Sequence, residues 1–598
     1  MSTTIREAER VVGFLKTAKE IEGNVWDQSL QREFQIRLVK NRQYLNTSAN
    51  TQSYQKLTSE QCHILREKDI EMTYEMAKSI IDAKGYVGGP EMRGRQSMSV
   101  LVKLGLVYYE ITANGKIVRI SDAGNKLISG EISFEELMCD ALFKYQYPNP
   151  SEAGFTKWNT IPFINTLRLI NEVNILCKER NQNPKGISAT EFGIFALSLR
   201  RYDQVHATAL ELLKFRGELK KIPEEDKEEY IDCYIKNYLR EFNNPIKNCR
   251  EYTDNMIRYV RMTRYVCIHG KYEHMYVDLE PRRMTEINSI LAADKGEAIN
   301  FTPEEWNKYM GTYGAYKLPF ETIGKLTEIA HEVIYENEML AKETGEPYIA
   351  PALPTSIADF KALIKREREC RTKLQNLLIR QDVHKNYKKI DETIEALRDV
   401  LCHNKTKRLA KRMSIELEKW TNVALNILND AILIRPNAAV GDDNEPLYTA
   451  PSGVPDIECY YKSFSLICEV TTLTSRDQWY NEGQPVMRHL REFENKNLQK
   501  PNYCLFVAPN LHKDTVNTFY IAVKYEYEGN KQNIIPITIT QLTKILQMVK
   551  SRITCGKEFL HNQLQELLDV CVDTASVKAS TEWLTHIQES IDSWCVKQ

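Results

Sequence analysis

Strand patterns alternate with helix patterns in the last third of the chain, and this alternation constrains the fold more than any other feature. Apolar runs typical of strands occur at 457–461, 464–468, 503–508 and 534–539. Residues 488–497 and 540–550 have the spacing of helices. Strands that alternate with helices form a mixed α/β sheet. We therefore expect an α/β domain over residues 381–598.

The rest of the chain is predicted to be largely helical and to contain several domains. With 598 residues, the chain is too long for a single hydrophobic core. Pro347, Pro351 and Pro354 have the spacing of a linker, and the segment 357–434 reads as long helix. The expected fold class is multidomain α+β. Its expected units are a first subdomain over 1–150, a second over 151–299, a helical linker over 300–380 and the α/β domain over 381–598.

Residues 69–120 have the element order of a winged helix. The pattern is a helix at 69–83, a glycine-rich break at 85–94, a helix at 96–103 and strands at 106–111 and 116–120. Asn114-Gly115 between the strands is a strong hairpin signal. The second helix of such a unit commonly enters the major groove, and here Arg93, Arg95 and Lys103 flank it. The alternative is an ordinary small α+β domain with solvated arginines.

A second helix-and-hairpin pattern follows at 250–279. Arg258, Arg261 and Arg264 recur every three residues of the helix pattern at 250–264, which places them near one face. Strand patterns at 265–268 and 274–279, with a turn at 269–271, complete a second winged-helix-like unit. The row of arginines suits contact with phosphates and base edges. The alternative is a solvated helix face with tyrosines in the core.

Composition excludes some classes of protein and leaves others open. A net charge of −1 does not indicate DNA binding, but a local basic face would suffice for it. The 14 cysteines contain no CxxC pair, which argues against a zinc ribbon. No phosphate-binding loop of the P-loop type is present, which argues against a nucleotide-dependent phosphotransfer enzyme. No apolar run is long enough for a membrane span, so we expect a cytoplasmic protein with reduced thiols.

The most informative segment for chemistry is 453–470. Its two strand patterns, joined by a short polar turn, can bring Asp456 and Glu469 to the same end, as in a PD-(D/E)xK nuclease core. Paired carboxylates can hold Mg²⁺ against a phosphate, where it activates water and stabilises the transition state. The carbonyl oxygen of Val470 is a further candidate ligand. The alternative is that Asp456 caps a strand and Glu469 lies at an exposed strand end.

At this point the sequence resembles the AlwI-type family of type IIS restriction endonucleases and the related site-specific nicking endonucleases. The resemblance is carried by Pro455-Asp456-Ile457-Glu458, Glu469-Val470-Thr471-Thr472, Pro485-Val486, Arg488-His489, the strand from Tyr503 to Pro509 and Ile535-Pro536-Ile537. Weaker similarity, including Tyr145-Gln146-Tyr147-Pro148, extends it over most of the chain. It implies a recognition region, a linker and a cleavage domain, in that order.

The resemblance also implies roles for particular residues. Asp456 and Glu469 match metal-binding carboxylates, Glu482 matches a further acidic site residue, and Glu418 matches an upstream glutamate that in isolation reads as a helix-surface residue. Thr471 stands where a nuclease of this kind usually has lysine. Glu482 is therefore the first candidate to activate water, and His489 is the second or a structural partner of a carboxylate.

The implied partners are double-stranded DNA, a companion DNA methyltransferase, and a second nuclease module for double-strand cutting. That module would come from a transient homodimer or from another subunit, and a chain that pairs poorly would act as a nickase. The implied cofactor is Mg²⁺. The competing hypothesis is a winged-helix DNA-binding regulator without catalytic activity, which would have no use for carboxylates on adjacent strand ends.

Overall fold

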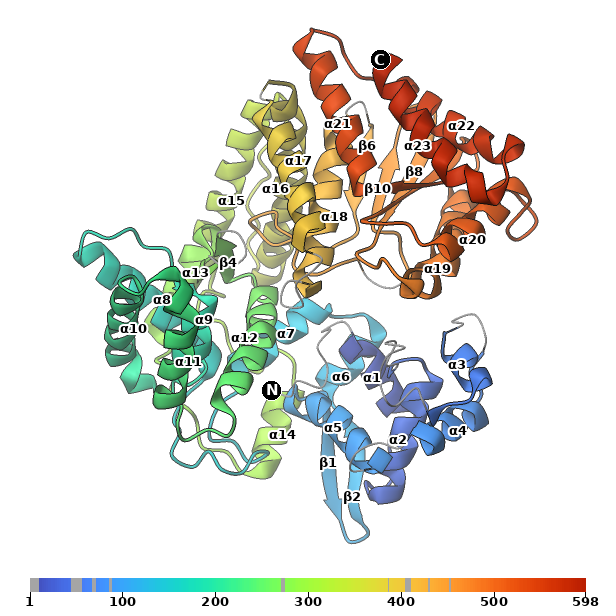
Figure 1. Ribbon diagram of the computed structural model, residues 1–598. Coiled ribbons are helices and arrows are strands. Elements are labelled where there is room, and N and C mark those ends of the chain that lie inside the picture. Colours follow the sequence, from blue (N-terminus) through green and yellow to red (C-terminus); the bar gives the residue numbers. More distant parts are fainter. Residues whose placement is uncertain are drawn as a thin grey trace.

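The computed structural model describes residues 10–44, 56–66, 71–84, 89–269, 275–385, 387–403, 410–428, 431–450 and 453–597. Buried apolar side chains form two large cores, one from Val11 to Ile364 and one from Ile390 to Trp594. Figure 1 shows the N-terminal half in blue and green and the C-terminal sheet in orange, with long helices beside the sheet. The chain thus folds around two main hydrophobic centres.

The described part of the first 150 residues is helical apart from one hairpin. Its helices are α1 (Arg10–Lys19), α2 (Gln28–Lys40), α3 (Ser59–Arg66), α4 (Tyr74–Lys84), α5 (Gly89–Lys103), α6 (Asp122–Ser129) and α7 (Phe134–Lys144). The antiparallel hairpin consists of β1 (Val107–Thr112) and β2 (Gly115–Ile120). The predicted order of helix, helix and hairpin is therefore present, although residues 69, 70 and 85–88 of that prediction lie outside the described residues.

The predicted glycine-rich break is wrong where it can be checked, because α5 already begins at Gly89. Gly94 lies within this helix, where a Cβ atom would come 1.9 Å from the carbonyl oxygen of Gln31 in α2. The glycine thus permits close packing of two helices and does not end one. As a consequence, Arg93 and Arg95 lie inside α5 and not before it.

The second region combines helices with a small antiparallel sheet. Its helices are α8 (Pro162–Glu179), α9 (Ala189–Glu191), α10 (Val205–Leu219), α11 (Lys227–Tyr238), α12 (Pro245–Met262) and α13 (Met284–Ala293). The sheet has the order β3 (Ile187–Ser188), β5 (Tyr276–Leu279), β4 (Val266–His269). The second predicted hairpin is thus present, and residues 270–274 of its turn lie outside the described residues.

Residues 190–201 have the apolar spacing of a helix, but the helix there is much shorter in the structure. It consists of α9 and one π-helical turn, Phe192–Ala196. The chain leaves the helix because Arg201 pairs with Asn159 in a parallel bridge, and the N–H of Asn159 donates to the carbonyl of Arg200. Tertiary pairing thus overrides the local helical pattern.

A group of longer helices joins the two cores. They are α14 (Pro303–Gly311), α15 (Ile323–Thr344), α16 (Ile357–Lys385), α17 (Lys388–His403) and α18 (Ala410–Ile427). Helix α15 packs along α16, and α17 packs along α18, as Figure 1 shows. The predicted helical run to residue 434 ends early, because residues from Leu433 onward form a strand that pairs with β7.

The C-terminal core contains a five-stranded mixed sheet. Its order is β10 (Ile534–Thr538), β9 (Asn502–Ala508), β8 (Ser465–Val470), β7 (Ile457–Tyr460), β6 (Leu433–Pro436). β6, β7 and β8 pair antiparallel, whereas β8, β9 and β10 pair parallel. All of β9 and all of β8 except Val470 are buried. Burial on both faces explains why these strands read as continuous apolar runs.

Five helices accompany the sheet: α19 (Arg476–Lys496), α20 (Lys513–Lys524), α21 (Ile539–Thr554), α22 (His561–Val577) and α23 (Ser580–Lys597). Parallel strands require crossover connections, and α19 and α20 supply them for β8–β9 and β9–β10. Among the helices of the described ranges, none is long and apolar enough to cross a membrane. The helical and sheet-forming parts together make a multidomain α+β protein.

Helix α19 begins twelve residues earlier than the predicted start at 488 and contains Pro485 in its interior. Ser475 caps it by accepting a hydrogen bond from the N–H of Asp477. The proline removes one backbone hydrogen bond, which normally breaks a helix. Burial of Val486, Leu490 and Phe493 offsets this loss, since the helix packs against β8 and β9.

Candidate active site

Asp456 and Glu469 meet at one end of the β7–β8 pair. Ile457 pairs with Cys468 in antiparallel register, and Asp456 directly precedes β7, so the next pair along the ladder is Asp456 with Glu469. The N–H of Val470 donates a hydrogen bond of 2.8 Å to Oδ2 of Asp456. The turn between the two strands therefore brings together two carboxylates that are 13 residues apart in the sequence.

The two carboxyl groups share an environment that disfavours their charged forms. Burial raises the pKa of Asp456 well above its usual range, and the charges of Glu469 and Glu482 raise it further, although the Val470 N–H opposes this shift. Burial and the charge of Glu482 likewise raise the pKa of Glu469. Crowded acidic groups of this kind are suited to binding a cation, which would relieve their repulsion.

Helix α19 contributes two further side chains to this end of the sheet. His489 is buried, and its Nδ1 lies 2.8 Å from Oε1 of Glu469. Glu482 lies seven residues earlier, which is two helical turns, and so shares a face with His489. Its effect on the pKa of both carboxyl groups shows that Glu482 lies near them.

Glu418 approaches Asp456 from another side. It is buried in α18, and its Oε2 accepts a hydrogen bond of 3.1 Å from the N–H of Ala450. Glu418 and Asp456 line a common cavity of about 200 Å³. Four acidic or imidazole side chains that the sequence predicts for the site thus gather around Asp456, from α18, β8 and α19.

The sequence gives no signal for Lys389 and Lys419, which line the same cavity. Their ammonium groups lie 5.3 Å and 4.9 Å from the centre of the Trp420 ring, and Lys419 also forms an ion pair of 2.6 Å with Glu445. A lone lysine in a helix pattern looks like any solvated residue, so only the fold reveals their position. Both lysines bring positive charge to the cavity that Asp456 lines.

Thr471, at the usual lysine position, is buried, and its Oγ1 accepts a hydrogen bond of 3.2 Å from the N–H of Leu473. It cannot carry a proton from water as an amine would. The side chains that could replace it are the acidic and imidazole groups named above and the two lysines of the same cavity, Lys389 and Lys419.

The donor set around Asp456 fits a hard divalent cation. Asp456 and Glu469 provide carboxylate oxygens, and a contribution from the backbone carbonyl of Val470 stays a prediction. No group of three or more acidic, histidine or cysteine side chains within the described ranges is arranged to hold a metal ion by itself. A cation here would complete its coordination with the carbonyl, water or a substrate phosphate, as Mg²⁺ commonly does.

The six basic residues predicted to bind DNA lie in varied surroundings. Arg93 donates to Gln96 at 3.2 Å, and Arg95 is exposed on α5. Lys103 forms an ion pair with Glu152. In each of these positions a DNA contact stays a prediction.

The second set of arginines faces carboxylates of the protein itself. Arg258 pairs with Asp254 at 2.9 Å, and Arg264 lies 3.9 Å from Asp442. The charge of Arg261 lowers the pKa of Asp443, although burial raises it overall. Arg261 and Arg264 therefore lie near the loop between β6 and β7. Their contact with DNA also stays a prediction.

A comparison with protein-family models decides the family. The model of the AlwI restriction endonuclease matches residues 102–545 of this chain, which is well over half of it. The chain belongs to the AlwI restriction endonuclease family. As a member, it is a restriction endonuclease, that is, a nuclease that binds DNA. The matched span includes Glu418, Asp456, Glu469, Glu482 and His489.

The chain was also compared with solved structures and with curated proteins. The chain is similar to a solved structure, the small subunit of the heterodimeric restriction endonuclease R.BspD6I, at 25% identity over 32% of this chain and 98% of that one. The TM-score of 0.28 is too low for this likeness to carry an argument. A comparison with curated proteins gave no match.

Proposed function

We propose that this member of the family is a type IIS restriction endonuclease. It binds a short asymmetric sequence in double-stranded DNA and hydrolyses phosphodiester bonds a few base pairs away, with Mg²⁺ as cofactor. The observation that carries the proposal is the meeting of Asp456 and Glu469 across β7 and β8, with His489 hydrogen-bonded to Glu469. In a chain of a restriction endonuclease family, such a group is best explained as the cleavage site.

The order of elements supports a PD-(D/E)xK assignment for the C-terminal domain. One acidic residue precedes β7, the other lies near the end of the neighbouring strand β8, and a helix follows before β9. This places both carboxylates at one edge of a mixed sheet whose middle strands are buried. The site thus rests on buried strands of the sheet, as precise positioning of catalytic groups requires.

Asp456, Glu469 and the carbonyl of Val470 would hold the Mg²⁺ ion. When bound, the ion would lower the pKa of a water molecule and stabilise the charge that develops on the phosphate. The protein supplies the placement of the ligands: the Val470 N–H fixes the Asp456 carboxylate, and His489 fixes that of Glu469. Such outer hydrogen bonds orient ligands and tune a metal site.

The group that takes the proton from water differs from the usual lysine. Glu482 is our candidate for this base because it lies near both carboxylates and belongs to the same rigid helix as His489. A glutamate within hydrogen-bond reach of a water molecule can serve as a general base. His489 then acts through Glu469 and does not itself accept the proton.

The N-terminal half is proposed to recognise DNA. Units 1–150 and 151–299 would act as winged-helix-like readers, 300–380 as the linker and 381–598 as the cleavage domain. The hairpins β1–β2 and β4–β5, each preceded by a helix, support this division. Of the six basic residues considered, Arg95 is the exposed one and the foremost candidate for a phosphate contact.

One cleavage site cuts one strand, so a double-strand break requires a second module. We propose that it comes from transient self-association or from another subunit, and that without it the enzyme nicks DNA. A restriction enzyme that acts on cellular DNA also requires a companion methyltransferase that protects the host sequence. Both DNA and such a methyltransferase would meet the enzyme in the cytoplasm.

The test is cleavage of a supercoiled plasmid with and without Mg²⁺. Wild-type protein should nick or linearise the plasmid only with the cation, and Asp456→Ala should abolish the activity while it still binds DNA. Glu492→Gln, an exposed residue of α19, is the matched control and should cut normally. Full activity of Asp456→Ala would overturn the assigned site. DNA binding by the wild type without any cutting would favour a regulator.

A further inference from the structure

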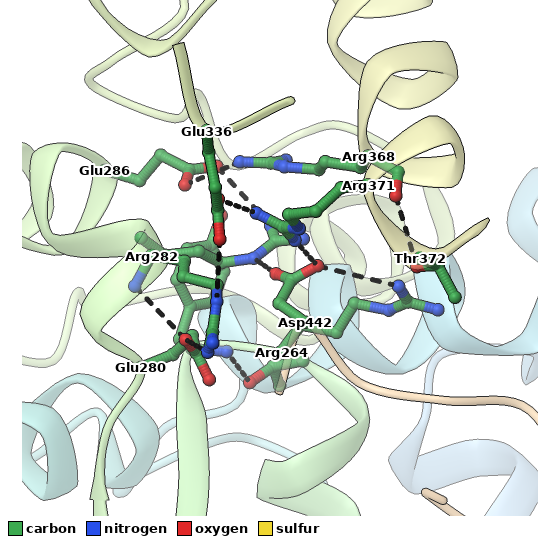
Figure 2. A network of polar contacts seen from close by, with 12 residues as sticks. Arg264, Glu280, Arg282, Glu286, Glu336, Arg368, Arg371, Thr372 and Asp442 are labelled. Carbon is green, nitrogen blue, oxygen red and sulfur yellow. Dashed lines mark hydrogen bonds and ion pairs between the residues drawn. The ribbon is translucent and has the colours of Figure 1, made fainter. Parts of the chain in front are cut away.

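A buried network of arginines and carboxylates joins three parts of the chain. Figure 2 shows Asp442, from the loop between β6 and β7, surrounded by arginines of the N-terminal half and of α16. The loop comprises residues 437–456 of the proposed cleavage domain, and the structure describes 437–450 and 453–456 of it. The network is therefore a direct connection between the proposed recognition half and the domain that carries Asp456.

Asp442 lies at the centre of this network. Its Oδ1 accepts a hydrogen bond of 2.7 Å from Nη2 of Arg371, and its Oδ2 accepts one from Nε of Arg283. Arg264 lies 3.9 Å from Oδ1. The side chains of Asp442 and Arg371 are 2% and 1% exposed. Three basic residues far apart in sequence thus converge on one buried carboxylate.

The arginines are held in turn by other carboxylates. Arg371 also pairs with Glu336 of α15 at 3.0 Å, and Arg283 pairs with Glu286 of α13 at 3.4 Å. Each of these buried charges therefore has a partner of opposite charge, and the ion pairs tie the contributing elements to one another. Figure 2 shows that the side chains come from the N-terminal half, the linker helices and the β6–β7 loop together.

The same loop makes further contacts outside the cleavage core. The hydroxyl of Tyr448 donates to Glu135 of α7, and the Tyr448 ring packs against the N-terminal hydrophobic core. Nδ2 of Asn444 donates to Oδ1 of Asn376 in α16 at 3.0 Å. The loop is therefore anchored to the N-terminal half at Tyr448 and to the linker helix at Asn444, in addition to Asp442.

Both ends of this loop are tied to the candidate active site. The N–H of Asn437 donates to the carbonyl of Asp456 at 2.9 Å, and its side-chain amide donates to the carbonyl of Pro455 at 2.8 Å. Near the other end, the N–H of Ala450 donates to Glu418. A shift of the loop would thus be transmitted to the residues that surround Asp456.

We propose that Asp442 is a positioning residue that sets which phosphodiester bond is cut. By holding the β6–β7 loop in the arginine network, it fixes the distance and orientation of Asp456 relative to the proposed recognition half. This inference rests on the proposed function, because only an enzyme that cuts outside its recognition sequence has an offset to set. The network acts through geometry, and Asp442 itself does not touch the scissile bond.

The test maps cut positions on an end-labelled duplex that carries the recognition sequence. Wild-type enzyme should cut at one bond in each strand that it cleaves. Asp442→Asn should spread the cuts over neighbouring bonds and lower the rate at the wild-type bond by roughly 10-fold, since small misplacement of reacting groups is costly. DNA affinity should remain unchanged. Glu328→Gln, which breaks an exposed ion pair with Lys325 in α15, is the control and should keep the single cut.

A single cut at the wild-type bond by folded Asp442→Asn would overturn the inference alone. A wild-type enzyme that does not cut at a fixed distance from a recognition sequence would instead overturn the proposed function, and the inference with it. If Asp442→Asn does not fold, Tyr448→Phe and Arg371→Lys provide the same readout with smaller perturbations. Retention of the single wild-type cut by both of these would equally refute the positioning role.

Discussion

Replacing Asp456 by Asn should stabilise the protein when no divalent cation is present. Extending the β7–β8 register by one position places Asp456 opposite Glu469, and the Cβ atoms of such cross-strand pairs lie about 5 Å apart. Two ionised carboxylates at about 5 Å repel each other by about 3 kcal/mol at an effective dielectric constant near 20. Asn removes this repulsion but accepts a weaker hydrogen bond from the Val470 N–H, which costs about 1 kcal/mol. The expected net gain is about 2 kcal/mol.

The gain should depend on pH in a defined direction. The pKa of Asp456 is raised in the folded protein, so the folded state holds its proton more tightly than the unfolded state does. The contribution of this group to stability is therefore full below its unfolded pKa and is lost as pH rises toward the folded pKa. The loss amounts to at most about 1.4 kcal/mol per pH unit. The advantage of Asp456→Asn should widen from pH 5 to pH 8.

The assay is thermal unfolding in EDTA and in Mg²⁺, measured by calorimetry. In EDTA at pH 8 the transition of the C-terminal core should rise by about 4–8 °C in Asp456→Asn, given the usual entropy of unfolding of such a unit. Mg²⁺ should stabilise the wild type but not the variant, because the variant lacks a ligand. A variant that is less stable than the wild type in EDTA at both pH values would refute the electrostatic reasoning. Glu492→Gln should behave like the wild type.

Three other changes test separate parts of the account. Glu482→Gln should lower kcat by at least about 100-fold with little change in KM for DNA, as expected on loss of a general base, and normal turnover would exclude Glu482 from that role. Arg95→Ala should reduce the slope of log Kd against log salt by about 0.9 if the side chain contacts one phosphate, and an unchanged slope in a salt titration would place α5 away from DNA. Trp583 is fully buried in α23, so Trp583→Ala should destabilise the C-terminal core by about 3–5 kcal/mol in denaturant unfolding, and a loss under 1 kcal/mol would show that this helix is not part of the core.

Local patterns in the sequence were sufficient to predict the hairpin that carries the candidate site. The apolar run at 464–468 and the tight turn before it correspond to β8 and its connection to β7. They could be predicted because a strand that is buried on both faces has a continuous apolar sequence. The hairpin predicted at Asn114-Gly115 is present for a similar reason, since Gly115, which pairs with Thr112, has a φ of 120° that favours glycine. In both places the structure depends on residues close together in the sequence.

The missed features depend on partners that are distant in the sequence. β6 reads as the end of a helix until its pairing with β7 is known, and the π-helical turn after α9 follows from the bridge between Asn159 and Arg201. The role of Asp442 is equally invisible, because Arg283 and Arg371 lie 159 and 71 positions away. Arg261 and Arg264 were predicted to face DNA by their spacing alone, and spacing carries no information about carboxylates of a remote loop.

Asp456 and Glu469 are proposed to hold one divalent cation between them at the cleavage site. Anomalous diffraction from crystals of the enzyme with bound DNA and Mn²⁺ locates this cation. We expect a Mn²⁺ peak coordinated by both carboxylates, beside a phosphate of the duplex. A Mn²⁺ ion bound at the cut phosphate by other residues, with Asp456 and Glu469 turned away from it, would show that these two carboxylates are not the metal site.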